Sequence, residues 1–208
     1  MSSARSVRGY VLAGGASSRF GSDKALAEVQ GKSMVARTVD LLSKVCENVA
    51  IVAQKTKLSD GTARTVVDRW PGQGPLGGIL TALLDVKQEV GEGKATLIVG
   101  CDMPFLNEEW LRFLAERASE SQAEAVVPKS RHGWEPLCSC WRVSAAEIVV
   151  PLFEAGTRKV TEALNVLHVE VLDEKDWKRF DTSGRLFWNM NTAADYQEAL
   201  HIFHSGNS

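Results

Sequence analysis

A glycine-rich segment near the N-terminus combines residue types that bind phosphate groups. Gly14 and Gly15 end a short apolar run, and the serines at 17–18 come before Arg19 and Lys24. Glycines let a ligand approach the backbone closely, and hydroxyl, N–H and cationic groups donate to phosphate oxygens. Neither GxxxxGK[ST] nor GxGxxG fits this segment. It therefore predicts a phosphate site of another kind, the alternative being a plain glycine-rich turn with solvated basic residues.

A second glycine-rich stretch, GQGPLG at residues 72–77, does match GxGxxG, and Asp102 follows it at a spacing close to that of a ribose-binding acid. Trp70 and Pro71 separate the stretch from the preceding strand, however, and Pro75 lacks the N–H that a pyrophosphate would need. A dinucleotide site here is the weaker alternative.

Three polar residues follow predicted strands. Asp102 comes after the apolar strand 95–99, Asp68 after the third strand and Gln54 after the second. Because the carboxyl ends of parallel strands share one sheet edge, we expect the loops at 12–24, 68–78 and 100–104 to converge there. Mg²⁺ is usually held by one or two carboxylates plus substrate phosphates, which favours Asp102 as its ligand. The alternative for each residue is a turn or helix-cap role.

Composition excludes several classes of protein. The chain has 208 residues, 44% of them hydrophobic, and a formal net charge of −2, so a global basic field for nucleic acid or a membrane surface is absent. No apolar run approaches the length of a membrane span, and no signal peptide is apparent at the N-terminus. The four cysteines, Cys46, Cys101, Cys138 and Cys140, form no CxxC motif. Sparse thiols of this kind predict a cytoplasmic protein, with Cys138 and Cys140 packed in the core rather than binding metal.

Hydrophobic periodicity predicts strands that alternate with helices and hence an α/β fold, with a mostly parallel sheet covered on both faces and an antiparallel addition in the second half. Predicted strands cover residues 10–14, 48–54, 63–68, 95–99, 124–128, 135–143 and 166–171, and predicted helices cover 33–45, 107–114, 144–153 and 192–200, with a loop entering a helix at 74–86.

Four stretches in this order, LAGGASSRFGSDKAL, GPLGGI, VGCDMPFL and NMNTAADY, resemble the motifs of the molybdenum cofactor guanylyltransferases in the nucleotidyltransferase superfamily. The resemblance extends from Val11 to about Tyr196. Related cytidylyltransferases usually carry LAAG and lack the GPLxGI loop, so both features favour guanine. The resemblance implies a three-layer, Rossmann-like nucleotidyltransferase fold. We expect a single domain over 1–208, with flexible ends at 1–8 and 202–208.

The resemblance also implies nucleotide-site residues, which are Leu12, Ala13, Gly14, Gly15, Arg19, Lys24, Gln54, Asp68 and Asp102. Backbone groups of 12–14 would contact guanine, with Gln54 where the family commonly has asparagine. Gly15 and Arg19 would lie at the phosphates and Lys24 on the triphosphate. Asp68 would contact the nucleoside, and Asp102 would bind Mg²⁺.

On the acceptor side, a GxRKV segment at 156–160 supplies Arg158 and Lys159, and an NxNTP-like motif supplies Asn189 and Asn191. Ala193 stands where that motif usually has proline, which predicts a looser helix start without loss of a ligand. Trp134 and Trp188 lie near these segments and either pack in the core or stack on the pterin.

The implied reaction transfers GMP from GTP to the terminal phosphate of molybdopterin and releases pyrophosphate, with Arg19, Lys24 and Asp102 as catalytic residues. A phosphate monoester has a second pKa of about 6, so this nucleophile needs no general base. The expected partners are GTP, molybdopterin and the molybdoenzymes or chaperones that receive the product. The alternatives are a cytidylyltransferase for the same cofactor, a sugar-phosphate nucleotidyltransferase and a non-catalytic nucleotide-binding regulator.

Overall fold

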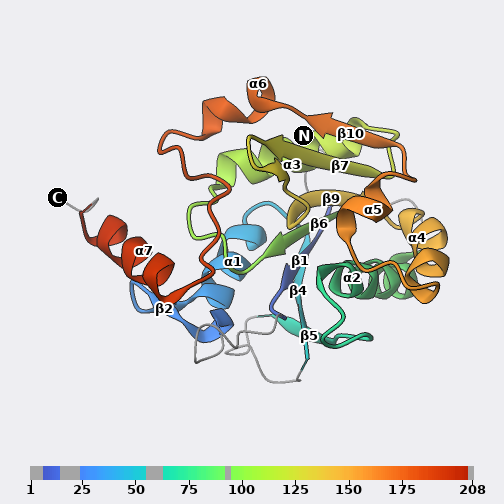
Figure 1. The fold of residues 1–208 in the computed structure, drawn as a ribbon, viewed down its shortest axis with the longest axis horizontal. Helices are drawn as coiled ribbons and strands as arrows, with labels where there is room; N and C mark the ends of the chain where they lie inside the picture. The colour runs from blue at the N-terminus through green and yellow to red at the C-terminus, as the bar shows by residue number, and fades with distance from the viewer. Residues whose placement is uncertain (1–6, 15–23, 55–62, 92–94, 206–208) are drawn as a thin grey trace.

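The computed structural model describes residues 7–14, 24–54, 63–91 and 95–205 (Figure 1). Its main sheet has the strand order β10-β7-β9-β6-β1-β4-β5, with β8 paired to β7 outside this path. The strands are β1 (Arg8–Leu12), β4 (Asn48–Ala53), β5 (Arg64–Val67), β6 (Ala95–Gly100), β7 (Ala125–Ser130), β8 (Gly133–Trp134), β9 (Cys138–Arg142) and β10 (Val169–Leu172).

The pairing confirms the predicted mixture of directions. β1 is parallel to both β4 and β6, and β5 is parallel to β4. β9 lies antiparallel between β6 and β7, and β10 is parallel to β7. The strands β1, β4, β5, β6, β7 and β10 therefore end at the same edge of the sheet, and β9 begins there.

Strand β6 explains why its sequence is a continuous apolar run. Every one of its residues is buried, because β1 and β9 flank it and helices cover both faces of the sheet. A strand buried on both faces does not show the alternation of a half-exposed strand.

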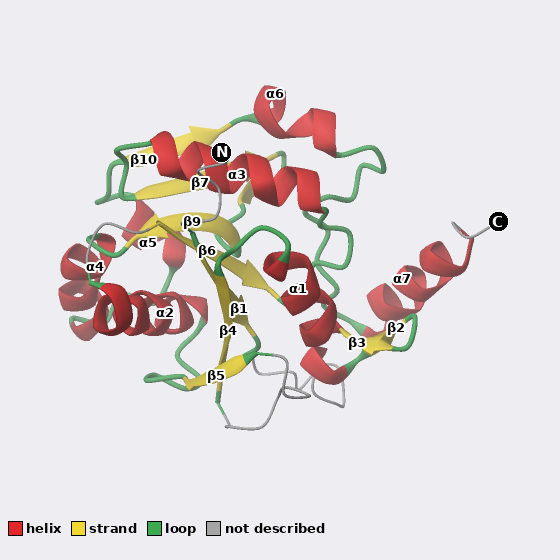
Figure 2. Cartoon of the chain, turned by 180° about the vertical axis from the view of Figure 1, so that it is seen from behind, coloured by secondary structure: helices red, strands yellow, loops and turns green. Residues whose placement is uncertain are grey.

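Helices pack on both faces, which gives the predicted three-layer α/β fold (Figure 2). α1 (Met34–Ser43) and α3 (Glu108–Glu120) contribute to the core on one face. α2 (Pro75–Val90), α4 (Ala145–Glu154) and α5 (Val160–Leu164) contribute to the core on the other. Alternate residues of β1 divide between these cores: Val11 belongs to the first, Tyr10 and Leu12 to the second.

The helix starts agree with the capping signals. The Ser33 hydroxyl accepts a hydrogen bond from the backbone N–H of Ala36, and the Asn107 side chain accepts one from Trp110. Pro75 occupies the first position of α2, where its missing N–H costs nothing. Helix α3 extends to Glu120, beyond the predicted end at Leu114, because Ala115 and Ala118 continue its buried face.

The C-terminal helix α7 (Ala193–Ser205) lies away from the main sheet (Figure 1). It packs on a small ribbon of β2 (Glu28–Val29) and β3 (Lys32–Ser33) through a separate cluster that includes Val29, Met34, Met190 and Ala199. The pattern at 192–200 thus predicts the helix but not its extension to Ser205. The short elements η2 (Lys24–Leu26), α6 (Glu174–Trp177) and η3 (Lys178–Phe180), like β2, β3, β8 and α5, carry no periodicity and were not predicted.

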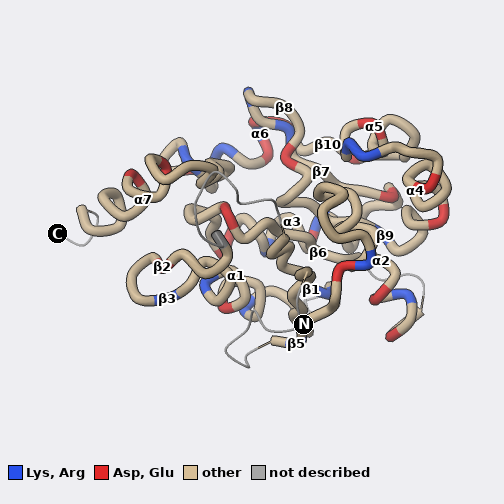
Figure 3. Tube along the Cα trace, turned by 60° about the horizontal axis from the view of Figure 1, so that its bottom comes forward, with Lys and Arg blue, Asp and Glu red and all other residues tan. Residues whose placement is uncertain are grey.

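Cys138 and Cys140 are core residues, as predicted, and Cys46 and Cys101 are core residues as well. All four are buried, and the Trp110 indole N–H lies 3.2 Å from Cys138 Sγ. Burial raises the pKa of the Cys46 and Cys138 thiols to about 12, which keeps them protonated. Acidic and basic positions are interspersed along the trace (Figure 3). Within the described ranges, no helix is long and apolar enough to cross a membrane.

Candidate functional site

The ends of four parallel strands bring the predicted nucleotide residues to one edge. The N–H of Ala13 donates to Val52 O at 2.9 Å, and the N–H of Asp68 donates to Ala53 O at 2.8 Å. The N–H of Cys101 donates to Leu12 O at 3.3 Å. Residues 12–14, 54, 68 and 101–102 therefore follow one another along the sheet edge, as the predicted convergence of the loops requires.

Part of the predicted phosphate loop lies outside the described residues. Gly15 and Arg19 are among those positions, and for Lys24 only the backbone, which opens η2, is described. The phosphate contacts of these three residues stay predictions. Gln54 lies at the end of β4 with an exposed side chain, which leaves its contact with a base open.

The Asp102 carboxylate occupies space that only glycine at position 100 leaves open. A Cβ placed on Gly100 would lie 2.8 Å from Asp102 Oδ1 and 3.4 Å from Leu137 Cβ. The backbone carbonyl of Asp102 accepts a hydrogen bond from Met190 at 2.8 Å. Asp102 is thus fixed between the end of β6 and the segment that carries Asn189 and Asn191.

The donor set at this edge fits a metal shared with substrate phosphates. Among the described residues, no group of three or more His, Cys, Asp and Glu side chains is arranged to hold a metal by protein ligands alone. Asp102 places one carboxylate, with room kept for it by Gly100, where the triphosphate would lie. Mg²⁺ typically takes one or two carboxylates and fills its remaining positions with phosphate and water oxygens.

Asp68 makes the bonds of a turn residue. Its Oδ1 accepts from the Trp70 N–H at 3.0 Å and from the Thr81 hydroxyl at 3.1 Å. Thr81, on α2, also accepts from the N–H of Arg69. The turn role that the sequence left open is therefore present, and it ties the end of β5 to α2. Contact with a nucleoside stays a prediction.

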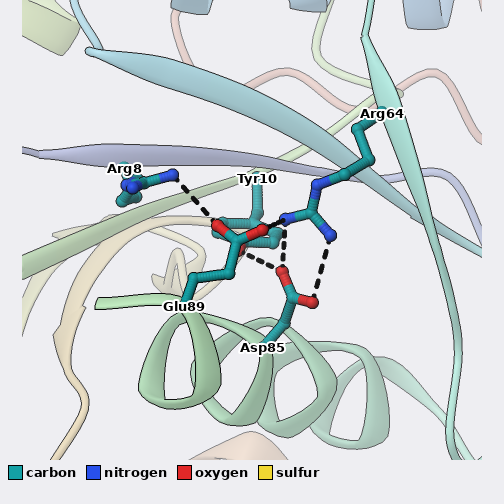
Figure 4. Close-up of polar contacts among 5 residues, drawn as sticks. All are labelled: Arg8, Tyr10, Arg64, Asp85 and Glu89. Atoms are coloured by element: carbon teal, nitrogen blue, oxygen red, sulfur yellow. Dashed lines mark hydrogen bonds and ion pairs between the residues drawn. The ribbon is translucent and has the colours of Figure 1, made fainter. Parts of the chain in front are cut away.

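The other end of β5 is fixed to α2 by an ionic cluster (Figure 4). Arg64 contacts Asp85 at 2.6 Å and Glu89 at 2.9 Å, and Arg8 contacts Glu89 at 3.0 Å. The Tyr10 hydroxyl donates to Asp85 at 2.5 Å. Burial and this bond raise the pKa of Tyr10. Burial alone would raise the pKa of Asp85, but hydrogen bonds from Arg64 and Tyr10 outweigh it and lower that pKa.

The GPLGGI stretch brings the start of α2 against the strand ends. A Cβ on Gly77 would lie 3.2 Å from Trp70 Cβ, and one on Gly78 would lie 3.3 Å from a Leu12 methyl carbon. Gly74 precedes the helix with a φ of 86°, which favours glycine. These glycines serve backbone conformation and close packing, so the GxGxxG match reflects the fold rather than a dinucleotide fingerprint.

Arg158 lies beside this loop. Its guanidinium stacks 4.1 Å from the centre of the Phe153 ring and donates to the backbone oxygens of Phe153 and Thr157. The Phe153 ring in turn packs on Trp70, and Arg158 O lies 3.9 Å from where a Cβ of Gly74 would be. Lys159 is exposed and 3.6 Å from Glu162. The GxRKV segment therefore adjoins the predicted nucleotide loop.

The two predicted acceptor asparagines lie elsewhere, at a cavity of about 740 Å³. Asn189 and Asn191 line it together with Trp134 and Trp188, whereas Arg158 and Lys159 do not. The Asn189 amide donates to Phe187 O at 3.2 Å, and Asp195 accepts from the Asn191 N–H at 2.7 Å. Met190 lies between these two asparagines in the sequence, and its backbone N–H donates to Asp102 O. The cavity therefore adjoins the proposed metal ligand.

Sequence reasoning did not single out Glu135, which also lines this cavity. It is only 7% exposed, and its Oε1 accepts from the Ser130 hydroxyl at 2.6 Å. Burial raises the pKa of Glu135, and the hydrogen bond from Ser130 opposes the rise. The only sequence signal was the polar character of the SRHGWEP loop, which does not distinguish a buried acid from a solvated one.

Comparison with known proteins gives consistent results. The family model described as "MobA-like NTP transferase domain" matches residues 9–170. The molybdenum cofactor guanylyltransferase of Desulfosudis oleivorans is 30% identical over 202 residues, which cover 96% of this chain and 97% of that protein. A probable molybdenum cofactor guanylyltransferase of Chloroflexus aggregans is 31% identical, with 91% of each chain covered.

Among solved structures, molybdopterin-guanine dinucleotide biosynthesis protein A of Archaeoglobus fulgidus superposes with a TM-score of 0.82. It is 25% identical, and the alignment covers 96% of this chain and all of that one. The alignment thus covers nearly the whole chain, including β7, β9 and β10 as well as β1, β4, β5 and β6.

Proposed function

Because this chain belongs to the MobA-like NTP transferase family, we propose that it transfers GMP from GTP to the terminal phosphate of molybdopterin and releases pyrophosphate. The observation that carries the proposal is the convergence of residues 12–14, the start of α2 and Asp102 at one sheet edge, with a large cavity next to it. This arrangement supplies adjacent places for two substrates.

On the nucleotide side, the backbone groups of Leu12, Ala13 and Gly14 contact guanine, and Asp68 contacts the nucleoside. A Cβ on Gly14 would meet no atom within 4 Å in the part of the chain that the structure describes, which leaves room for a ligand beside this backbone. The start of α2 supplies partial positive charge near the same edge. Gly15, Arg19 and Lys24 bind the phosphates.

Asp102 would hold Mg²⁺ together with phosphate oxygens of GTP. The bound ion would supply positive charge that neutralises the triphosphate. Arg19 and Lys24 stabilise the charge that develops on the departing pyrophosphate. The acceptor phosphate is mostly ionised at neutral pH, so the residues align two polyanions rather than remove a proton.

On the acceptor side, Asn189 and Asn191 position the pterin substrate in the cavity beside Asp102. Arg158 and Lys159 lie next to the nucleotide loop and provide positive charge for phosphates at the junction of the two substrates. The buried thiols agree with a reducing compartment, and we place the enzyme in the cytoplasm.

The test is to incubate the protein with molybdopterin, Mg²⁺ and each nucleoside triphosphate separately, and to follow pyrophosphate release. GTP should support turnover and the other triphosphates should not. Turnover with CTP alone would make the protein a cytidylyltransferase. If pyrophosphate is released only when a sugar phosphate replaces molybdopterin, the proposed acceptor is wrong. If GTP binds but no pyrophosphate is released, the protein is a nucleotide-binding regulator.

A further inference from the structure

The acceptor cavity contains a buried carboxylate that the proposed reaction does not use. Glu135 lies just before β9, and its own backbone is fixed because its N–H donates to Pro128 O at 2.9 Å. The Glu135 carbonyl accepts from Cys138 at 3.1 Å. An acid with two backbone anchors and 7% exposure has little freedom to move into solvent.

A buried carboxylate is costly unless hydrogen bonds compensate it. Ser130 supplies one such bond, to Oε1, and no other described residue donates to the Glu135 carboxylate. A carboxylate accepts about four hydrogen bonds, and Glu135 lines the cavity, so a ligand there can supply further donors. The site is thus built to receive donors from a ligand.

The rest of the cavity wall favours a flat heterocycle. Trp134, Trp177 and Trp188 line it, and Trp177 is held in place by an indole N–H bond to Lys129 O at 3.1 Å. The cations Arg131 and Lys178 also line the cavity, together with the acids Glu174, which pairs with Lys178, and Asp181. Aromatic faces, a buried acceptor and cations together suit a planar ring with adjacent N–H donors and an attached phosphate.

The aminopyrimidinone ring of a pterin has this chemistry, because its ring N–H and its 2-amino group point the same way. We propose that Glu135 determines acceptor specificity by accepting both of these hydrogen bonds, with Ser130 as a positioning residue for its carboxylate. The inference rests on the proposed function, since it takes the acceptor to be a pterin.

The test measures binding without catalysis. Wild type, Glu135→Gln and Ser130→Ala are titrated with pterin and with lumazine, which has a 2-oxo group in place of the 2-amino group, and pteridine fluorescence is followed. Wild type should bind pterin at least about tenfold more tightly than lumazine, because lumazine lacks one donor and leaves the acid unpaired. Glu135→Gln should reduce that ratio to within about twofold, and Ser130→Ala should reduce it by a few-fold.

Glu174→Gln is the matched control, because Glu174 also lines the cavity but its side chain is 61% exposed and pairs with Lys178. It should leave the pterin-to-lumazine ratio unchanged. An unchanged ratio in Glu135→Gln, no preference in wild type, or no binding of pterin would each overturn the inference. If Glu135→Gln does not fold, as judged by its melting temperature, an unchanged ratio in Ser130→Ala overturns it.

Turnover separates this inference from the proposed function. In the pyrophosphate assay, Glu135→Gln should raise KM for molybdopterin about tenfold or more and leave KM for GTP unchanged. Pyrophosphate release from GTP by wild type, with no change in the acceptor KM of the variant, refutes the role of Glu135 and leaves the guanylyltransferase proposal intact. Failure of wild type to use GTP refutes that proposal, and the pterin titration still decides the role of Glu135.

Discussion

The proposed nucleotide half of the sheet edge, which comprises residues 12–14, 68 and 100–102, differs in its assembly from the proposed acceptor cavity, which Glu135, Asn189 and Asn191 line. Residues 12–14, 68 and 100–102 lie at the ends of parallel strands or directly after them, so the ladder hydrogen bonds of β1, β4, β5 and β6 fix their positions. The cavity is instead lined by side chains from the end of β7, from β8 and the residues around it, and from residues 174–191. Residues 174–191 form no strand of the sheet.

The difference separates two kinds of recognition. A backbone fixed by a ladder presents donors and acceptors that no substitution except proline removes, which would suit the proposed base and triphosphate. Side chains on loops can be exchanged without altering the sheet, which would suit recognition of the proposed acceptor. The two halves meet where the Met190 N–H donates to Asp102 O, so perturbing each half separately tests the division.

Asp102→Asn removes charge at this meeting point and should have the largest effect. The amide keeps the shape of the side chain but loses the charge that we propose to hold Mg²⁺. We expect kcat to fall by about two orders of magnitude or more, as when one preorganised charge is removed. Steady-state pyrophosphate release measures kcat. Asp40→Asn, which removes an exposed partner of Lys32, is the control, and near-normal activity of Asp102→Asn at saturating Mg²⁺ would exclude Asp102 as a ligand.

The backbone of the nucleotide half should give base selectivity. Fixed groups that pair with guanine lose water without gaining partners when cytosine enters, so we expect kcat/KM for GTP to exceed that for CTP at least about a hundredfold. A Cβ on Gly14 meets no atom of the described residues within 4 Å. Gly14→Ala should therefore leave the melting temperature unchanged and reduce the preference by weakening GTP. Equal use of both nucleotides by wild type contradicts the assignment.

Gly100→Ala tests whether the position of the carboxylate matters as much as its presence. The new methyl would lie 2.8 Å from Asp102 Oδ1, the far end of a side chain that can rotate away. The fold should survive, whereas kcat should fall about tenfold and the Mg²⁺ requirement should rise. Gly9→Ala in β1 is the matched control, because its methyl would crowd Cys46 Sγ at 3.0 Å. It should lower the melting temperature without changing kcat, and the same pattern in Gly100→Ala would contradict the prediction.

Asp85→Asn tests the contacts that fix β1 and β5 to α2 rather than any contact with a nucleotide. Asp85 accepts from Tyr10 and Arg64, so we expect the free energy of unfolding to fall by about 1–2 kcal/mol at neutral pH. Because the folded pKa of Asp85 is lowered, its stabilisation is present above the unfolded value of about 3.9 and is lost as pH falls through the folded pKa. Urea unfolding between pH 7 and about pH 3 should show a flatter acid limb in the variant. If the free energy of unfolding changes with pH in the same way in both proteins, the prediction is wrong.

Sequence reasoning predicted the strands and helix starts near residues 12–14 and 100–102 well because the evidence for these elements is local. The apolar run of β6, the caps Ser33 and Asn107, and Pro75 at the start of α2 each act within a few residues of where they stand. The antiparallel place of β9 between β6 and β7 was predicted only as an added pair, because pairing partners depend on long-range packing.

The acceptor half could not be predicted to the same degree. Nothing in the sequence SRHGWEP distinguishes a buried Glu135 from a solvated one, since the cavity that it lines is completed by residues of 174–191, which are distant in the sequence. The same holds for Arg158: its motif is visible, but its position on Phe153 beside the nucleotide loop follows from the packing of α4 against α2.

Ala193→Pro should have the smallest effect and act on the acceptor half alone. The start of α7 is already capped, because the Thr192 hydroxyl accepts from the Asp195 N–H at 3.1 Å and the Asp195 carboxylate accepts from the N–H groups of Thr192 and Asn191 at 2.7 Å. Ala193 is exposed at the first helical position, where proline fits without losing a hydrogen bond.

Ala193→Pro should raise the free energy of unfolding by about 0.4–1 kcal/mol, because proline reduces the conformational freedom of the unfolded chain. For a protein of this size the melting temperature should rise by about 1–3 °C, with kcat and both KM values unchanged, because the capped start already holds Asn191 at the cavity. Glu198→Pro, in the interior of the same helix, is the control and should lower the melting temperature. A fall in the KM of Ala193→Pro for molybdopterin would contradict this prediction. It would mean that the start of α7 is loose in the native protein, as the missing proline alone predicts, and that the position of Asn191 depends on the start of this helix.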